Sequence, residues 1–179
     1  RQRQMCIRDS LKAFAQYKKQ AADKYPLVLA GGKGWLEDDL EEFIQELGLS
    51  EDVRVLGYVS DEELSWLYSN CFSFVYPSLY EGFGLPVLEA MEHGAAVVTS
   101  NTTSLPEVAG DAAHYVNPLD EIDIAEAFGK LERDTDYREM LKRKAIIQAE
   151  KFSWEKSASE VLYIYREVMS MEKFGGSFA

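Results

Sequence analysis

Cysteine, long apolar runs and positive charge are all scarce in this sequence. Its two cysteines, Cys6 and Cys71, are too few for a disulfide framework, which favours a reducing compartment, so we expect a cytoplasmic protein. No apolar run approaches the length of about 18 residues that a membrane span needs, so none is predicted. With 19 lysines and arginines against 31 aspartates and glutamates, the net charge is −12. That balance argues against nucleic acid or an anionic membrane as a partner.

The chain is nevertheless long and apolar enough to fold. Of its 179 residues, 46% are hydrophobic and 28% are charged, a balance typical of globular rather than disordered proteins. This length predicts one domain. Acidity does not exclude phosphate ligands, because helix N-termini and backbone amides bind anions without positively charged side chains.

Residues 1–9 differ from the rest of the chain. They contain three arginines in an acidic protein and show no clear period. The string 3–10 resembles the translation of a transposon end used in sequencing libraries, so we interpret residues 1–9 as a non-native scar on a truncated reading frame. A natural basic first turn of the next helix is the alternative. The predicted domain is 10–171, and we expect 172–179 to be a frayed tail.

Short apolar runs and amphipathic segments alternate along the chain. The predicted strands are 27–30, 53–56, 71–76, 95–99 and 114–116; the predicted helices are 11–24, 36–47, a short segment after Ser60, 86–94, 121–132, 135–150 and 154–171. Ser60 and Glu63 form a capping box at the start of the short helix. The alternation predicts an α/β fold with a Rossmann-like, doubly wound parallel sheet and a helical C-terminal end. The wholly apolar run 27–30 is typical of a strand buried on both faces.

Ligands of doubly wound sheets bind at the carboxyl ends of the strands. The corresponding loops here are 31–36, 57–61, 77–86, 99–106 and 117–120. In the loop 77–86, Gly82 and Gly84 permit positive φ and a close approach of backbone to ligand. Pro86 suits the first turn of the next helix, so the amides of residues 83–87 are expected to form an anion site at its N-terminus.

Two carboxylates bracket this loop. Glu81 precedes the glycines, and Glu89 follows after seven intervening residues. A carboxylate accepts two hydroxyl hydrogen bonds and so suits a sugar diol. Amides for phosphate and carboxylates for hydroxyls together describe a nucleotide-sugar site. Taken singly, Glu81 is also explained as a solvated loop acid, Glu89 as a charge favoured near a helix N-terminus, and the glycines as a turn.

The segment 81–90, Glu-Gly-Phe-Gly-Leu-Pro-Val-Leu-Glu-Ala, resembles the Glu, seven residues, Glu motif of the retaining glycosyltransferases of family 4, which have the two-domain GT-B architecture. The resemblance covers nearly all of residues 11–171 and includes the segments 29–31, 55–59, 90–94 and 105–108. It implies that this chain is the C-terminal, donor-binding domain of such an enzyme.

The resemblance also implies roles for individual residues. Glu89 is expected to hold ribose hydroxyls, and Glu81, the residue with the catalytic role, to contact the transferred sugar. The other donor-binding positions that it implies are Gly31, Gly32, Tyr58, Val59, Ser60, Leu64, Gly82, Phe83, Gly84, Leu85 and Val87. Backbone and shape select the nucleobase in this family, so the segment 58–60 leaves it open.

Members of this family transfer a sugar from a nucleoside-diphosphate sugar with retention and usually without a metal, so neither a metal site nor a cofactor is expected. An Arg and a Lys that clamp the diphosphate lie at the end of the domain's first strand, and that strand, like the N-terminal acceptor domain, has no counterpart here. We therefore assign the clamp to no residue and expect at most weak donor binding by this chain alone.

Two alternatives remain open. One is a non-catalytic nucleotide-sugar-binding or interaction domain; the other is a different GT-B activity, such as a sugar-nucleotide epimerase or a phosphorylase. His93, at the end of the helix 86–94, complements the helix dipole better than it suits catalysis. Apolar residues of the last helix, among them Tyr163 and Met169, are expected to mark the contact surface of the other domain.

Overall fold

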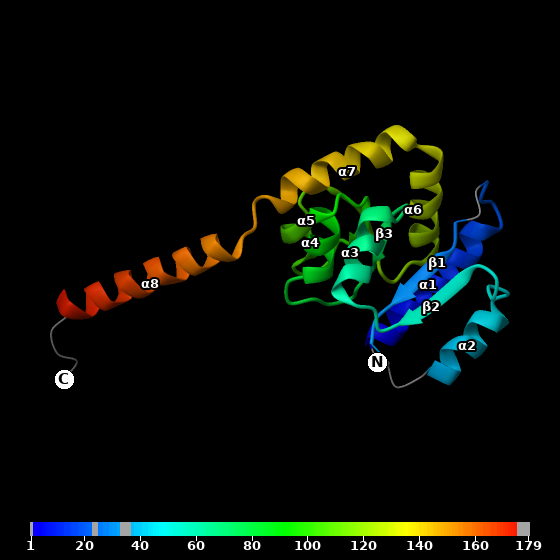
Figure 1. Cartoon of the computed structure of the whole chain (residues 1–179), viewed down its shortest axis with the longest axis horizontal. Coiled ribbons are helices and arrows are strands. Elements are labelled where there is room, and N and C mark those ends of the chain that lie inside the picture. The colour runs from blue at the N-terminus through cyan, green and yellow to red at the C-terminus, as the bar shows by residue number, and fades with distance from the viewer. Residues whose placement is uncertain (1, 23–24, 33–36, 175–179) are drawn as a thin grey trace. The chain divides into compact units, whose positions relative to one another are not determined.

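The computed structural model describes residues 2–22, 25–32 and 37–174, which form two compact units, residues 1–149 and residues 150–179. Strands and helices alternate in the first unit (Figure 1). Their order is α1 (Gln2–Lys18), β1 (Leu27–Ala30), α2 (Glu37–Glu46), β2 (Val53–Gly57), α3 (Asp61–Asn70), β3 (Phe74–Tyr76), α4 (Leu85–Glu92), β4 (Val97–Ser100), α5 (Leu105–Ala109), β5 (Ala113–Val116), α6 (Glu121–Arg133) and α7 (Thr135–Ala149). The alternating α/β architecture expected from the sequence is confirmed.

The strands form two parallel sheets. β1 pairs with β2, and β3, β4 and β5 pair in that order. β1 and β3 are not hydrogen-bonded to each other, so each keeps one unpaired edge. All pairs are parallel, as right-handed crossovers require.

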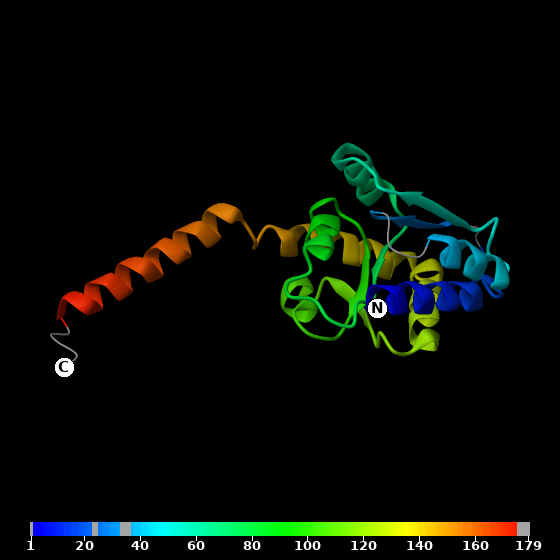
Figure 2. The same ribbon diagram turned by 90° about the horizontal axis from the view of Figure 1, so that it is seen from below.

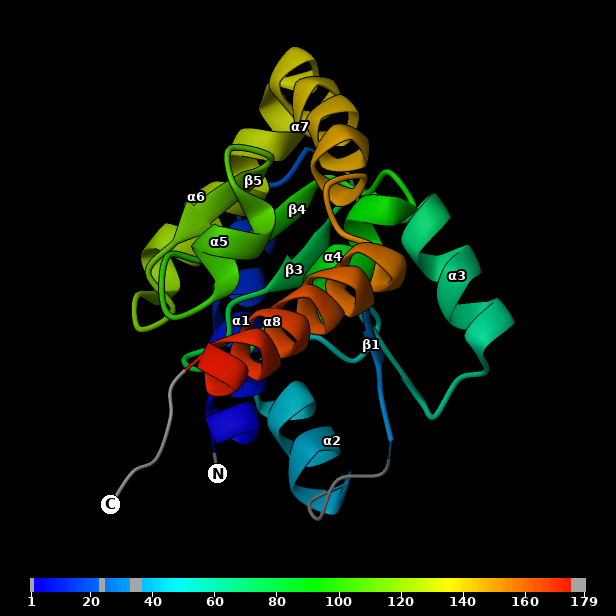
Figure 3. The ribbon, with the colours of Figure 1, turned by 90° about the vertical axis from the view of Figure 1, so that its left-hand side faces the viewer.

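Helices cover the three-stranded sheet on both faces (Figures 2 and 3). Ala96 and Val98 face a core that α1 and α6 share, where Phe14 and Phe128 meet edge to face with centroids 6.1 Å apart. Because side chains alternate along a strand, Val97 faces the opposite side, where α4 and α5 contact β4. Every residue of β4 is buried, as expected for the central strand.

The expectation that strand 27–30 is buried on both faces is wrong. Leu27 and Leu29 pack against the core, but Val28 is 38% exposed and Ala30 is also exposed. Val55, on the paired strand β2, is 45% exposed. An apolar run does not show how many layers cover it, and here helices cover only one face of β1.

Several other element boundaries differ from the predictions. α1 begins at Gln2 rather than at residue 11 and ends at Lys18. β3 begins at Phe74 rather than at 71. The sequence suggested a loop over residues 99–106, but the five-residue helix α5 begins within it, at Leu105, and extends to Ala109.

The second unit contains one helix, α8 (Trp154–Phe174). Its described side chains are exposed, including the large apolar residues Trp154, Val161, Leu162, Tyr163, Ile164, Tyr165, Val168 and Met169. Across the described ranges, no helix combines the length and apolar character needed to cross a bilayer.

Candidate functional site

The glycine loop, residues 77–84, connects β3 to α4. β3 and β4 run parallel, so their carboxyl ends and the loops that follow them lie at one edge of the sheet. Gly84 is the N-cap of α4 with φ of 104°, and a Cβ built on it would lie 2.6 Å from Cδ2 of the fully buried Leu105. Glycine is required here both for the left-handed backbone and for the close approach of α5.

Gly82 differs from Gly84, because only Gly84 uses the positive φ that glycine permits. Gly82 has no left-handed backbone, and a Cβ on it would meet nothing within 4 Å. It is exposed, as are Phe83 and Leu85. The amides of Gly82 and Leu85 have no hydrogen-bond partner among the described residues. These features leave backbone donors at the start of α4 open to an anion, which is what the predicted phosphate site needs.

Hydroxyl side chains that follow β4 hold the glycine loop in place. Ser104 Oγ donates to the carbonyl oxygens of Glu81 and Phe83, at 2.9 Å in each case. Thr103 Oγ1 accepts from the Glu81 amide at 3.2 Å, and Thr103 takes a φ of 54°, which is costly for a β-branched residue. From the sequence, this stretch is predictable only as a possible ligand loop, because contacts between residues some 20 positions apart leave no local signal.

Glu81 is fixed through one of its two carboxylate oxygens. Its Oε1 accepts from the Tyr76 hydroxyl at 2.7 Å and from the Ser78 hydroxyl at 2.9 Å. No hydrogen bond reaches its Oε2 within the described parts of the chain. Glu81 is half-buried, so its second oxygen is oriented by the first and remains able to accept a ligand hydroxyl.

Glu89 is held in the same way from α3. Its Oε2 accepts from the Tyr68 hydroxyl at 3.2 Å. Burial of Tyr68 raises the pKa of its phenol, and the neighbouring Glu89 charge raises it further. The phenol therefore stays protonated and donates to the carboxylate.

An aromatic row joins the two acids. Phe74 and Tyr76 lie on the same face of β3, stacked with centroids 5.9 Å apart, and Tyr68 meets Phe74 edge to face at 5.3 Å. Since Tyr76 holds Glu81 and Tyr68 holds Glu89, both acids lie along this row. The structure thus brings the two predicted carboxylates and the glycine loop together on one face of β3, at its carboxyl end. Val87, on the first turn of α4, is instead fully buried.

The other predicted donor residues lie at the carboxyl ends of β1 and β2. The Gly31 amide donates to the Gly57 carbonyl at 2.8 Å, and Gly31, Gly32 and Tyr58 are exposed. The predicted capping box is confirmed: Ser60 Oγ accepts from the Glu63 amide and Glu63 Oε2 from the Ser60 amide. Val59 and Leu64 are half-buried beside it. α3 connects this group to Glu89 through Tyr68. Residues 33–36 of the predicted loop lie outside the described residues.

Ion pairs, His93 and the groups that could bind a metal also bear on what this site can do. Neither Glu81 nor Glu89 has an ion pair among the residues that the structure describes. His93 Nδ1 lies 2.8 Å from the Glu89 carbonyl at the end of α4, a structural position. Within the same ranges, no group of three or more His, Cys, Asp and Glu side chains is arranged to hold a metal ion.

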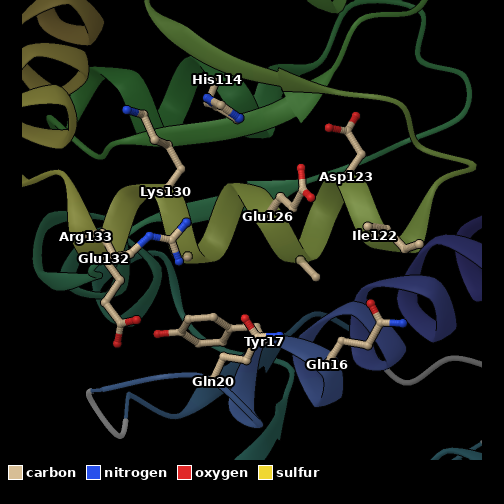
Figure 4. Close-up of a pocket in the computed structure, with 12 residues that line it drawn as sticks. Gln16, Tyr17, Gln20, His114, Ile122, Asp123, Glu126, Lys130, Glu132 and Arg133 are labelled. Carbon is tan, nitrogen blue, oxygen red and sulfur yellow. The ribbon is translucent and has the colours of Figure 1, made fainter.

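A cavity of about 570 Å³ lies away from this site, between α1 and α6. Figure 4 shows side chains of the two helices facing one another across it. Its polar lining includes Gln16, Gln20, Glu126, Lys130 and Arg133. None of the predicted donor residues lines it.

Comparison with known proteins gives consistent matches. A model of the family described as "Glycosyl transferases group 1" matches residues 6–148. The chain is 44% identical over 161 residues to the O-antigen chain mannosyltransferase B of Escherichia coli, covering 89% of this chain and 42% of that protein. Sucrose-phosphate synthase from Thermosynechococcus elongatus superposes with a TM-score of 0.78 at 26% identity, over 92% of this chain and 43% of that one.

Anabaena HepE, solved in complex with UDP and glucose, superposes with a TM-score of 0.76 at 22% identity, over 88% of this chain and 44% of that one. Solved neighbours of this kind are GT-B glycosyltransferases, and the GT-B fold expected from the sequence is confirmed. In each of these three comparisons the chain spans less than half the length of the protein that it matches.

Proposed function

The chain belongs to the group 1 glycosyltransferase family, and from this we propose that it is the donor-binding domain of an enzyme that moves a sugar from a nucleoside-diphosphate sugar to an acceptor with retention of anomeric configuration. The mannosyltransferase relative makes nucleoside-diphosphate mannose the first donor to test. The solved neighbour that holds UDP and glucose supports a nucleotide-sugar as the class of ligand.

One observation carries the proposal. A glycine loop with open amides at the start of α4 lies beside two carboxylates, each fixed on one oxygen by tyrosine hydroxyls. The amides suit the diphosphate, Glu89 suits the ribose diol and Glu81 suits the hydroxyls of the transferred sugar. Gly31, Gly32 and Tyr58 to Ser60 are assigned to the nucleobase side of the same donor.

The chemistry needs stabilisation of charge on the leaving group. The bond between the sugar's anomeric carbon and the β-phosphate oxygen breaks with its electron pair on the phosphate. The oxygen of the acceptor hydroxyl bonds to the anomeric carbon, and its proton passes to the departing nucleoside diphosphate. The open amides of the glycine loop are positioned to share this charge. No metal ion is part of the proposal.

Cations for the diphosphate have to come from outside the described residues. Glu81 and Glu89 lack ion-pair partners there, and the whole chain carries a net charge of −12. We assign the clamping residues and the acceptor site to the rest of the parent protein. This chain alone should bind donor weakly and show no turnover.

Calorimetric or NMR titration of the 179-residue chain with GDP, UDP and ADP tests the proposal, with the Glu89→Ala variant alongside it. Glu92→Ala is the matched control, because Glu92 lies on the same helix and is exposed. We expect one nucleotide to bind, Glu89→Ala to weaken it about tenfold or more through loss of charge-assisted hydrogen bonds, and Glu92→Ala to bind as the wild type does. Equal affinities of all three proteins, or no binding of any nucleotide, would contradict the proposal.

A further inference from the structure

Tyr68 is the one buried residue of α3, and its polar atom lies at the site. It is 7% exposed, and its hydroxyl donates to Glu89 Oε2 at 3.2 Å. A buried hydroxyl needs a hydrogen-bond partner. Phenylalanine at this position would satisfy the packing alone, so the hydroxyl calls for a separate explanation.

The ring of Tyr68 is held on two sides. Phe74 of β3 packs against it edge to face at 5.3 Å, and the His93 ring lies 5.7 Å away. His93 is itself tied to Glu89, because its Nδ1 lies 2.8 Å from the Glu89 carbonyl oxygen. These contacts hold the Tyr68 ring beside α4, within hydrogen-bond reach of Glu89.

In the hydrogen bond between Tyr68 and Glu89, the phenol is the donor and the carboxylate is the acceptor. Burial and the Glu89 charge both raise the pKa of Tyr68, so the phenol stays protonated and donates a hydrogen bond to the carboxylate. Oε2 of Glu89 is thereby engaged, while Oε1 receives no hydrogen bond among the described residues. A carboxylate pinned at one oxygen presents the other in a fixed direction and loses less side-chain freedom when a ligand arrives.

We propose that Tyr68 is a positioning residue for ligand recognition: its hydroxyl pins Oε2 of Glu89 so that Oε1 is presented to the ribose hydroxyls of the bound nucleotide. The proposal rests on the donor-binding function above. It also gives α3 a role in the site, since the helix that follows the segment 58–60 sets the orientation of Glu89. Selectivity for ribose over a sugar without hydroxyls then depends on a residue that does not touch the ligand.

A purely structural role for Tyr68 makes a different prediction. If the residue only packs α3 against α4, losing its hydroxyl weakens every nucleotide equally or weakens none. If it orients Glu89, the loss falls on ligands that have ribose hydroxyls and spares those that lack them.

The test compares the 179-residue wild type with Tyr68→Phe, using the tightest-binding of GDP, UDP and ADP together with its 2′,3′-dideoxy analogue. Tyr115→Phe is the matched control, because it also removes one tyrosine hydroxyl from a partly buried hydrogen bond: the Tyr115 hydroxyl donates to the Gly110 carbonyl away from the site. Glu89→Gln and the double variant Tyr68→Phe/Glu89→Gln complete a double-mutant cycle.

We expect Tyr68→Phe to weaken the ribonucleotide roughly 2- to 10-fold, the range for one net hydrogen bond, and to leave the dideoxy analogue unchanged. Tyr115→Phe should alter neither ligand. The double variant should bind as Glu89→Gln does, because Tyr68 acts only through the carboxylate. Equal weakening of both ligands by Tyr68→Phe, no weakening at all, or additive losses in the double variant would overturn the proposal.

Three outcomes distinguish failure of the Tyr68 proposal from failure of the donor-binding function. If Tyr68→Phe does not fold, the wild type decides: the Tyr68 ring resonances should shift more with the ribonucleotide than with the dideoxy analogue, and equal shifts would overturn the proposal. If the wild type binds no nucleotide, the donor-binding function fails, and the role of Tyr68 fails with it. If the wild type prefers the ribonucleotide and Tyr68→Phe keeps that preference, the function stands and the Tyr68 proposal alone is wrong.

Discussion

Replacing Gly84 by alanine should destabilise the first unit far more than replacing Gly82, two residues earlier. A Cβ on Gly84 would lie 2.6 Å from Cδ2 of Leu105, and the φ of 104° is one that alanine rarely adopts. Although the clash is with the end of a side chain, Leu105 is fully buried, so moving it disturbs the packing of the core. A Cβ on Gly82 meets nothing within 4 Å.

The magnitude follows from two costs. A non-glycine residue in a rarely populated backbone region costs about 1–3 kcal/mol, and overpacking a filled core costs about 1–3 kcal/mol. Gly84→Ala should therefore lose about 2–6 kcal/mol of unfolding free energy, a large part of the 5–15 kcal/mol or so of a typical domain. Gly82→Ala should stay within about 0.5 kcal/mol of the wild type.

Urea denaturation of the three proteins, followed by far-UV circular dichroism, measures the difference through the transition midpoint at constant slope. A loss of less than about 1 kcal/mol for Gly84→Ala, or equal losses for both variants, would refute the reasoning. Such a result would mean that the glycine loop does not approach α5 as closely as the structure shows.

Two further predictions concern Ser104 and His114. Ser104→Ala should speed hydrogen exchange of the amides in the glycine loop and weaken nucleotide binding without unfolding α5, because Ser104 Oγ bonds the Glu81 and Phe83 carbonyls and makes no helix-capping bond; unchanged exchange in the loop would count against this role. Burial lowers the pKa of His114 below its ordinary 6.5, so the folded state resists protonation and unfolding free energy should fall as pH drops below about 6.5. His114→Gln should flatten that decline in denaturation curves at pH 7 and pH 5, and an equally steep decline in the variant would show that other groups cause it.

Local signals in the sequence were sufficient for most of the elements. The strand 27–30 has the predicted bounds, and the Ser60–Glu63 capping box is present with both of its hydrogen bonds. Apolar periodicity and caps depend on neighbours within a few positions, so they are readable without coordinates. The five-residue helix α5 was missed, although Pro106 in its first turn and Glu107 after Ser104 were signals for it.

What sequence reasoning could not supply is contact between distant segments. The exposure of Val28 follows from which face of β1 the helices cover, and an apolar run says nothing about that. The pairing of Tyr68 with Glu89 joins residues 21 positions apart. Glu81 and Glu89 could be named from their spacing, but the hydroxyls that orient them belong to residues whose side chains carry no motif.

The central claim is that the glycine loop and its two acids form the nucleotide site, and mapping a bound nucleotide by NMR tests it most directly. With the tightest-binding nucleoside diphosphate, we expect the largest amide shifts at Gly82 to Leu85 and at Glu89. The largest shifts at Gln16, Gln20 and Lys130, around the cavity between α1 and α6, would contradict the claim.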